Sequence, residues 1–350
     1  MTTVAAYGTN GPTEDLVAMR IDRREPDAAD VDIEILYCGV CHSDLHSARN
    51  DWGFSLYPLV PGHEIVGRVA RVGAEVSRYK PGDLVAVGCL VDSCRTCPSC
   101  EEDLEQYCHG GMVGTYGSPD PRHGNAVTFG GYSQRIVVNE NFVLRIPPNL
   151  DIKAAAPLLC AGITTWSPLR HWNVGPGQTV GVIGLGGLGH MGVKFAHAMG
   201  ARVVMITSSP GKAADARKLG ADEVLVSSDA NAMADYANQF DLLLNTIPVA
   251  HDINPYLSLL KRDGTMVVVG ALVPLSEPLQ LGALVMQRRS VAGSIIGGIK
   301  ETQEMLDFCA EHNILPDVEM ITIDTINDAY QRMLKNDVKY RFVIDIASLG

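Results

Sequence analysis

Positive charge is scarce in this chain relative to negative charge. Its 350 residues include 28 lysines and arginines against 40 aspartates and glutamates, so the formal net charge is −12. A surface of that sign repels phosphate groups, and we therefore expect neither nucleic acid nor an anionic membrane as a partner. The sequence also lacks an apolar run long enough to span a bilayer. Its first residues, MTTVA, do not resemble a signal peptide, so the expected location is the cytoplasm.

Cysteine, by contrast, is well represented, with nine residues. In a reducing cytosol this number indicates metal or catalytic use rather than disulfides. Four of the nine fall close together, at Cys94, Cys97, Cys100 and Cys108. Such spacing is typical of a closed tetrahedral four-thiolate zinc site, which holds a lobe in place and leaves no position for a substrate. An iron–sulfur cluster also uses four cysteines, but the short polar loop favours zinc.

A second group of possible metal ligands begins with Cys41 and His63, each within two residues of a glycine. A catalytic zinc site uses three protein ligands and leaves one position open, and Cys160 is the best candidate for the third. Any one of these residues alone is more readily interpreted as a buried thiol or a core histidine. Their occurrence together with the four-cysteine motif and a nucleotide motif favours a catalytic metal site.

The pattern of short and long periodic segments predicts two domains. From about residue 31 to 147, short β-like runs are cut by glycine and proline, which is typical of a barrel-like or sandwich domain. After Asp151, strands alternate with helical stretches, which predicts a doubly wound parallel sheet. The last part of the chain should pack back onto the first domain. The expected fold class is α/β, with a β-rich domain formed by residues 1–155 and 298–350, a metal lobe at about 90–112, and an inserted domain at 156–297.

A glycine-rich turn follows the first strand of the inserted domain. Residues 184–189 read GLGGLG, after a buried run at 179–183 and before a helical stretch. In this context the glycines let the backbone approach a pyrophosphate, and the helix N-terminus supplies free N–H groups. An NAD site would place an acid near the end of the second strand. Residues 207–212 instead read TSSPGK, whose hydroxyls and lysine suit the 2′-phosphate of NADP(H), although Ser208 and Ser209 can also cap the next helix.

Together these motifs resemble the zinc-dependent medium-chain alcohol dehydrogenases, most closely the cinnamyl-alcohol-dehydrogenase branch with its bacterial NADPH-dependent aldehyde reductases. The resemblance covers nearly the whole chain and includes residues 39–44, 62–67, 160–164 and 337–345. It implies a GroES-like catalytic domain, a Rossmann domain, an active site in the cleft between them, and usually a dimer or tetramer. Of these assemblies we expect a homodimer.

The resemblance also implies roles for individual residues. Cys41, His63 and Cys160 would ligate the catalytic zinc, Glu64 would enter as a fourth ligand when the site is free, and Asp44 would orient the histidine. Apart from the resemblance, Ser43 lies two residues after Cys41 and His46 three residues further on. This spacing suggests a hydroxyl-to-imidazole path by which a proton leaves the site, since an imidazole titrates near neutral pH. The residues expected to touch the cofactor are Thr164, Gly184, Leu185, Gly186, Gly187, Leu188, Gly189, Thr207, Ser208, Ser209, Lys212, Thr246, Gly270, Ser294, Ile295 and Ile296.

The expected activity is hydride transfer between NADPH and a broad range of aliphatic and aromatic aldehydes, giving primary alcohols, with two zinc ions per chain and zinc polarising the carbonyl. One alternative is a cinnamyl-alcohol-type dehydrogenase that works mainly in the direction of oxidation. Others are a zinc hydrolase, or a redox sensor built on the four-cysteine lobe, but both leave the dinucleotide motif unused. Four aromatic residues are candidates for a substrate pocket, or equally for the core: Trp52, Tyr57, Tyr116 and Trp166.

Overall fold

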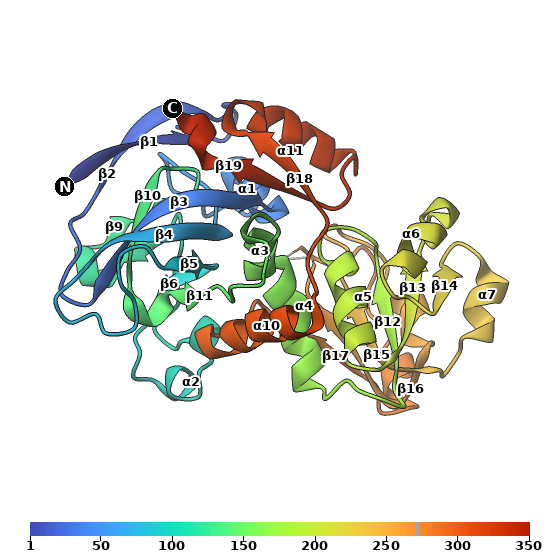
Figure 1. Cartoon of the computed structure of the whole chain (residues 1–350). Helices are drawn as coiled ribbons and strands as arrows, with labels where there is room; N and C mark the ends of the chain where they lie inside the picture. Colours follow the sequence, from blue (N-terminus) through green and yellow to red (C-terminus); the bar gives the residue numbers. More distant parts are fainter. Residues whose placement is uncertain (271–272) are drawn as a thin grey trace. The chain divides into compact units, whose positions relative to one another are not determined.

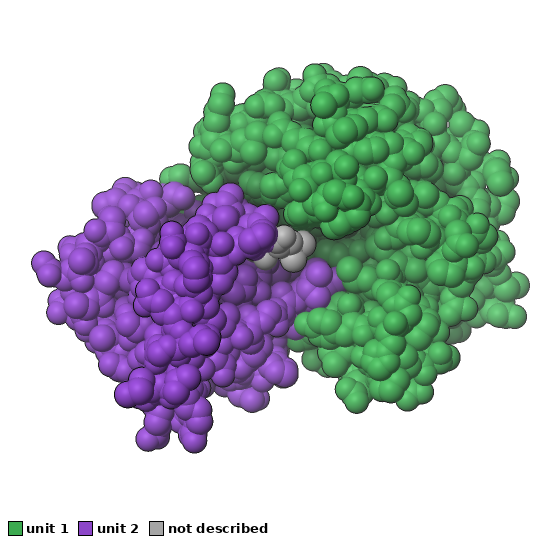
Figure 2. All heavy atoms as spheres, turned by 180° about the vertical axis from the view of Figure 1, so that it is seen from behind, with its two compact units in different colours: residues 1–163, 297–350 green, residues 164–296 purple. Residues whose placement is uncertain are grey.

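The structure is a computed structural model that describes residues 1–270 and 273–350 (Figure 1). It divides into two compact units, residues 1–163 with 297–350 and residues 164–296, which Figure 2 distinguishes by colour. No helix in the described part of the chain is long and apolar enough to cross a membrane.

The first unit is built on a seven-stranded sheet in which β10 pairs with β3 beside the path β11-β5-β4-β3-β19-β18. β-branched residues such as Val31, Ile33 and Ile35 of β3 are buried in its core. Near the end of the chain β19 pairs antiparallel with β3, with Val343 opposite Gly39, so the last segment packs onto the first unit as expected. The strands are β11 (Leu144–Arg145), β5 (Leu84–Val87), β4 (Ile65–Val72), β3 (Asp30–Val40), β19 (Arg341–Asp345), β18 (Val318–Thr322) and β10 (Arg135–Asn139).

Three two-stranded sheets and several short helices complete this unit. The paired strands are β1 (Thr2–Gly8) with β2 (Val17–Arg23), β6 (Leu90–Asp92) with β7 (Val113–Gly114), and β8 (Pro119–Asp120) with β9 (Ala126–Val127). The helices are α1 (His42–Ala48), α2 (Pro98–Glu101), α3 (Ile152–Ala155), α10 (Ile299–His312) and α11 (Ile326–Leu334), with 3₁₀ turns η1 (Glu105–Tyr107), η2 (Pro121–His123), η3 (Glu140–Phe142), η4 (Ala156–Leu159), η6 (Ile323–Thr325) and η7 (Ile346–Leu349).

The second unit is a six-stranded, fully parallel sheet in the order β14-β13-β12-β15-β16-β17. Read in chain order this is 3-2-1-4-5-6, the strand order of a Rossmann fold, so the expected doubly wound sheet is confirmed. Its strands are β12 (Thr179–Ile183), β13 (Arg202–Thr207), β14 (Glu223–Val226), β15 (Phe240–Asn245), β16 (Leu260–Val268) and β17 (Ser290–Gly293). The helices are α5 (Gly189–Ala198), α6 (Ala213–Lys218), α7 (Ala230–Asp235), α8 (Asn254–Leu257) and α9 (Leu281–Val285), with the 3₁₀ turn η5 (Pro210–Lys212).

The division between the units differs from the boundary expected at residue 155. The turn η4 and the start of α4 (Ala161–His171) belong to the first unit, which runs to residue 163. The physical reason is burial: η4 is made of Ala156, Pro157 and two leucines, all buried, and it packs against β3, β4, β5 and β19. This packing places Cys160, the residue after η4, in the same unit as Cys41 and His63.

Candidate functional site

Four possible metal ligands converge in the first unit. The ligand atoms of Cys41, His63, Glu64 and Cys160 all lie within 4.8 Å of one another, and all four residues are buried. The sulfur atoms of Cys41 and Cys160 are 3.8 Å apart. That separation excludes a disulfide and equals the spacing of about 3.8 Å that two thiolates bound at about 2.3 Å adopt around tetrahedral zinc.

Three separate chain segments deliver these side chains. Cys41 follows β3 and is the N-cap of α1, His63 and Glu64 immediately precede β4, and Cys160 follows η4. The pKa of Cys41 lies well below its ordinary value, because hydrogen bonds from Cys160 and His63 stabilise its thiolate and outweigh burial. The sequence-predicted ligands are therefore brought together, with one thiolate already favoured.

Asp44 is the centre of a buried hydrogen-bond network behind the histidine. Its carboxylate accepts from the backbone N–H of Cys41 at 2.8 Å and of Gly62 at 3.1 Å, and from the hydroxyl of Tyr132 at 3.1 Å. Its Oδ1 atom lies 3.2 Å from Nδ1 of His63. A carboxylate in this position fixes the orientation of the imidazole and leaves Nε2 for a metal. No local pattern in the sequence indicates this role for Tyr132.

Glu64 forms a buried ion pair with Arg341. Burial, opposed by the charge of Arg341, raises the pKa of Glu64 to about 7. The other carboxylate oxygen, Oε2, is buried and has no hydrogen-bond partner among the described residues. A side chain at Gly39 would place its Cβ 1.9 Å from that oxygen, so only glycine leaves room for it. An orphaned carboxylate oxygen beside two thiols and an imidazole fits a site that holds a divalent metal.

The two residues expected to carry the proton, Ser43 and His46, both lie on α1. The hydroxyl oxygen of Ser43 is 3.6 Å from the sulfur of Cys41. Nδ1 of His46 is hydrogen bonded to Asp51 at 2.8 Å, and its ring lies against Trp52 with centroids 5.4 Å apart. Asp51 was not expected from the sequence. A transfer path from Ser43 to His46 stays a prediction.

Two of the aromatic pocket candidates belong to different units. The ring of Tyr116 stacks on His63 with centroids 5.6 Å apart. Trp166 instead is buried in the second unit, where its ring meets the edge of Phe195. Tyr116 therefore lies at the candidate metal site, whereas Trp166 is a core residue.

The four cysteines of the lobe also form one group, with all four sulfur atoms within 4.8 Å of one another. The sulfur of Cys100 lies 3.9 Å from that of Cys94 and 3.5 Å from that of Cys97. Hydrogen bonds from the backbone N–H of Thr96 and from Cys108 lower the pKa of Cys94 to about 6. A hydrogen bond from the backbone N–H of His109 likewise lowers the pKa of Cys97. Four clustered sulfurs, two of them stabilised as thiolates, fit a structural zinc ion.

A third group, Asp27, Asp30 and His123, has similar spacing but a different electrostatic setting. Arg24 forms ion pairs with both carboxylates. Because its guanidinium already supplies a positive charge to the cluster, we assign no metal to it.

The glycine-rich turn of the second unit has the shape that a dinucleotide needs. Gly184 has a φ of +92°, and a Cβ at Gly189 would lie 1.8 Å from the carbonyl oxygen of Gly184, so the first turn of α5 packs closely on the end of β12. A Cβ at Gly186, in contrast, would meet no atom within 4 Å. The turn thus has one glycine that faces open space, where a pyrophosphate fits over the helix N-terminus. The ammonium of Lys212 donates to the carbonyl of Leu185 at 3.0 Å, which brings a positive charge to the same turn.

The remaining residues expected to touch the cofactor follow the ends of successive strands. Carboxyl ends of parallel strands meet at one edge of a sheet, where dinucleotides bind. Residues 184–188 follow β12, residues 207–212 end or follow β13, Thr246 follows β15, Gly270 lies just beyond β16, and residues 294–296 follow β17. Thr164 is the exception, because it lies within α4. Which of these residues touch a cofactor stays a prediction.

The Rossmann-type sheet with its glycine-rich turn, together with the group of Cys41, His63, Glu64 and Cys160, defines a dinucleotide-binding dehydrogenase with a metal-dependent catalytic unit. The family profile described as "Alcohol dehydrogenase GroES-like domain" matches residues 27–148, and that described as "Zinc-binding dehydrogenase" matches residues 187–311. The chain belongs to this family of zinc-binding alcohol dehydrogenases, as the resemblance in its sequence implied.

Several known proteins are similar over the whole chain. Aldehyde reductase YahK of Escherichia coli (strain K12) is 58% identical over 347 residues, which cover 99% of this chain and 98% of that protein. NADP-dependent alcohol dehydrogenase C 1 of Mycolicibacterium smegmatis is 55% identical, covering 100% and 99%. The solved structure of cinnamyl alcohol dehydrogenase SbCAD4 of Sorghum bicolor superposes with a TM-score of 0.95 at 46% identity, covering 99% and 98%. These likenesses agree with the expected branch of the family.

Proposed function

We propose that this protein is an NADP-dependent zinc alcohol dehydrogenase that reduces aldehydes to primary alcohols with NADPH. The convergence of Cys41, His63 and Cys160 with the orphaned oxygen of Glu64 carries the proposal. Membership of the zinc-binding dehydrogenases favours hydride transfer over the hydrolase alternative. The similar proteins named aldehyde reductase and NADP-dependent alcohol dehydrogenase support the substrate class and the cofactor.

Cys41, His63 and Cys160 would hold the catalytic zinc, with Glu64 able to turn toward it, and Cys94, Cys97, Cys100 and Cys108 would hold the structural zinc. When bound, the catalytic zinc supplies a Lewis acid and NADPH supplies the hydride. The protein's own part is orientation and exclusion of water. Asp44 holds His63 in one orientation from a fully buried position, and the burial of both thiols excludes water from the centre.

Proton supply is the second task of the chain. Reduction of an aldehyde needs a proton at the product oxygen. Ser43 lies beside Cys41, and His46 lies on the same helix with 25% of its side chain exposed. In our proposal the hydroxyl of Ser43 passes a proton inward and His46, held by Asp51, is reloaded from water.

Preference for NADPH is proposed from the segment after β13. Ser208 and Ser209 are exposed and uncharged, and Lys212 lies at the glycine-rich turn. Hydroxyls and an ammonium bind a 2′-phosphate, whereas a carboxylate there would repel it.

A homodimer is proposed from the surface of the second unit. Helix α9 exposes Leu281, Val285 and the adjoining Met286, with exposed fractions of 63%, 77% and 79%. Strand β17 pairs with β16 alone within the described sheet, so its other edge is open. An apolar helix surface and an open sheet edge in one unit suit a symmetric contact with a second copy. The cytoplasmic location is proposed from the nine cysteines, all of them free thiols.

The decisive experiment measures NADPH oxidation with a panel of aliphatic and aromatic aldehydes in the two-zinc protein. Comparable kcat/KM values across the panel are expected, with no reaction when NADPH is omitted. The reverse reaction, NADP⁺ with cinnamyl alcohol, tests the oxidative alternative, which predicts the larger kcat/KM in that direction. Hydrolysis of esters without any cofactor would support the hydrolase and refute the proposal.

A further inference from the structure

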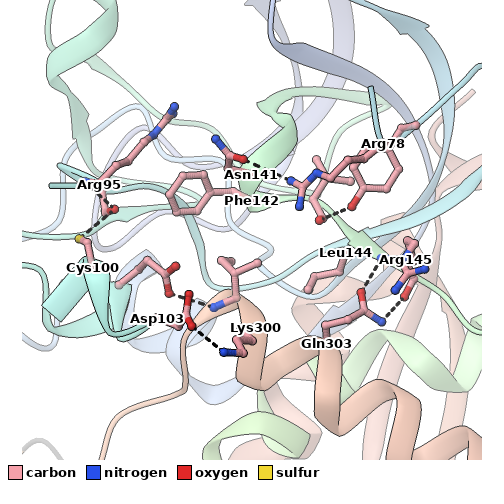
Figure 3. A pocket seen from close by; sticks show the side chains of 15 residues that line it. Arg78, Arg95, Cys100, Asp103, Asn141, Phe142, Leu144, Arg145, Lys300 and Gln303 are labelled. Carbon is pink, nitrogen blue, oxygen red and sulfur yellow. Dashed lines mark hydrogen bonds and ion pairs between the residues drawn. The ribbon is translucent and has the colours of Figure 1, made fainter. Parts of the chain in front are cut away.

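The four-cysteine lobe is fastened to the start of helix α10 by two acidic residues. Carboxylate Oε2 of Glu105 accepts the backbone N–H of Ile299 at 3.1 Å, and Oδ2 of Asp103 binds the ammonium of Lys300 at 2.9 Å. Figure 3 shows Asp103 and Lys300 joined in this way, with Cys100 nearby, around a cavity of about 660 Å³ that the lobe and α10 share. These contacts join positions 194 and 197 residues apart in the sequence.

Glu105 replaces the side-chain cap that α10 lacks. The N-cap residue of this helix is Gly298, which has no side chain to accept a hydrogen bond. A Cβ at Gly298 would lie 1.9 Å from the carbonyl oxygen of Asp103 and 2.6 Å from Oε2 of Glu105. The glycine therefore allows the lobe to approach, and a carboxylate from the lobe satisfies a free N–H and meets the positive end of the helix dipole.

The position of Glu105 depends on two of the lobe's cysteines. The backbone N–H of Asp103 donates to the carbonyl of Cys100 at 3.2 Å, and that of Cys108 donates to the carbonyl of Glu105 at 3.0 Å. The acidic segment 103–105 is thus hydrogen bonded at one end to Cys100 and at the other to Cys108, two proposed ligands of the structural zinc.

Helix α10 in turn packs on the segment that carries Cys160. A Cβ at Gly162 would lie 3.1 Å from the sulfur of Met305, and a Cβ at Gly297 would lie 2.6 Å from the side chain of Ile163. Met305 and Ile163 are both buried. Gly162 and Ile163 lie in the first turn of α4, directly after Cys160. A shift of α10 would therefore displace the backbone next to Cys160.

We propose that Glu105 is a positioning residue: it transmits closure of the four-cysteine lobe through the N-terminus of α10 to Cys160. The lobe then has a task in the reaction besides its own stability, since it helps to set the geometry of the catalytic metal. This inference rests on the two zinc sites of the proposed function.

The test compares Glu105→Ala with Glu102→Ala in the two-zinc protein. Glu102 is an exposed acid of the same lobe that makes none of these contacts, so it controls for the loss of charge. Hydrogen exchange is measured at the backbone of residues 299–301, together with the rate at which the catalytic metal passes to an added chelator. For Glu105→Ala we expect exchange about five- to tenfold faster, as the loss of a helix cap implies, and faster metal release. Glu102→Ala should leave both rates unchanged.

Glu105→Gln keeps an acceptor oxygen and should restore most of the protection, with kcat reduced less than in Glu105→Ala and the KM for NADPH unchanged in both. If Glu105→Ala does not fold, the same two rates measured in Glu105→Gln test the inference. Unchanged exchange in Glu105→Ala, or faster exchange with unchanged metal release, would overturn the inference. Metal content and NADPH-dependent turnover of the unmodified protein are measured first, because their absence refutes the proposed function and not the capping contact.

Discussion

Tyr132 donates its phenolic hydrogen to Asp44 across a 3.1 Å hydrogen bond in which both side chains are fully buried. Burial and the charge of Asp44 raise the pKa of Tyr132 well above its ordinary value, so the phenol stays protonated and acts as the donor. The bond joins residues 88 positions apart. Since Asp44 also contacts His63, Tyr132 is linked to the candidate metal site through Asp44 and His63.

Tyr132→Phe removes this hydroxyl and keeps the ring. A hydrogen bond to a charged acceptor contributes about 1.5–3 kcal/mol, and loss of an outer partner of a ligating histidine weakens metal binding about 10- to 100-fold. We expect a lower melting temperature and weaker retention of one zinc in competition with a chelator. Tyr79→Phe is the matched control, because it removes another buried hydroxyl, which donates to the carbonyl of Val143 and has no part in the network around Asp44. Equal zinc retention in the two variants would show that Tyr132 has no influence on the metal.

The two proposed metal centres should respond differently to loss of a thiol. Elemental analysis of the unmodified protein, purified without chelators, should find two zinc ions per chain and no iron. Cys100→Ser should lose the structural zinc and several kcal/mol of stability, since metal binding is part of the folding free energy of such a lobe. Cys160→Ser should lose activity and one zinc while unfolding at nearly the same temperature. A single zinc in the unmodified protein would contradict the assignment.

The cofactor preference depends on the charge at position 208. Ser208 is exposed, so a substitution there leaves the core intact. Ser208→Asp places a carboxylate where the 2′-phosphate is proposed to bind, and the ratio of kcat/KM for NADPH over NADH should fall at least tenfold and reverse. Ser208→Asn introduces a side chain of the same size as aspartate but without its charge, and should change the ratio much less. If the unmodified protein uses both cofactors equally well, the NADPH assignment is wrong.

The parts that the sequence predicted are those encoded by local spacing. The lobe cysteines lie within fifteen positions, and the glycine-rich turn lies between one strand and one helix, so each pattern carries its own geometry. The partners of the catalytic group follow instead from the register of the sheet. Arg341 reaches Glu64 because β19 pairs with β3, and Tyr132 reaches Asp44 from just before β10. No short-range pattern encodes contacts of this kind. The same holds for η4, which the sequence pattern places in the inserted domain. Its burial against four strands of the first unit depends on tertiary packing, which no local pattern encodes.

Acid stability should depend on the ion pair between Arg24 and Asp30. Burial alone would raise the pKa of Asp30, but hydrogen bonds from Arg24 and from the backbone of Asp27 outweigh it and lower the pKa below its ordinary value. A lowered pKa gives stability that is present above the unfolded value and lost as the pH falls through the folded value. Arg24→Met should therefore cost about 1 kcal/mol near pH 7, allowing for solvent screening, and progressively less below about pH 4. Urea unfolding at several pH values measures this difference. In an Asp30→Asn background only the exposed ion pair with Asp27 remains, so the pH-dependent part of the effect should be much smaller.

The proton path is tested by separating the hydroxyl from the imidazole. Ser43 lies next to Cys41, and His46 is held by Asp51 in a partly exposed position, so the two are expected to act in sequence. Ser43→Ala should nearly abolish turnover while zinc content and NADPH binding stay intact. His46→Ala should slow turnover less and change its pH profile, because water can take over part of the exchange with solvent. Asp51→Asn keeps a hydrogen-bond partner for His46 but removes the negative charge, and should slow turnover less than His46→Ala does. Full activity and an unaltered pH profile in His46→Ala would assign the histidine a purely structural role on the surface of α1.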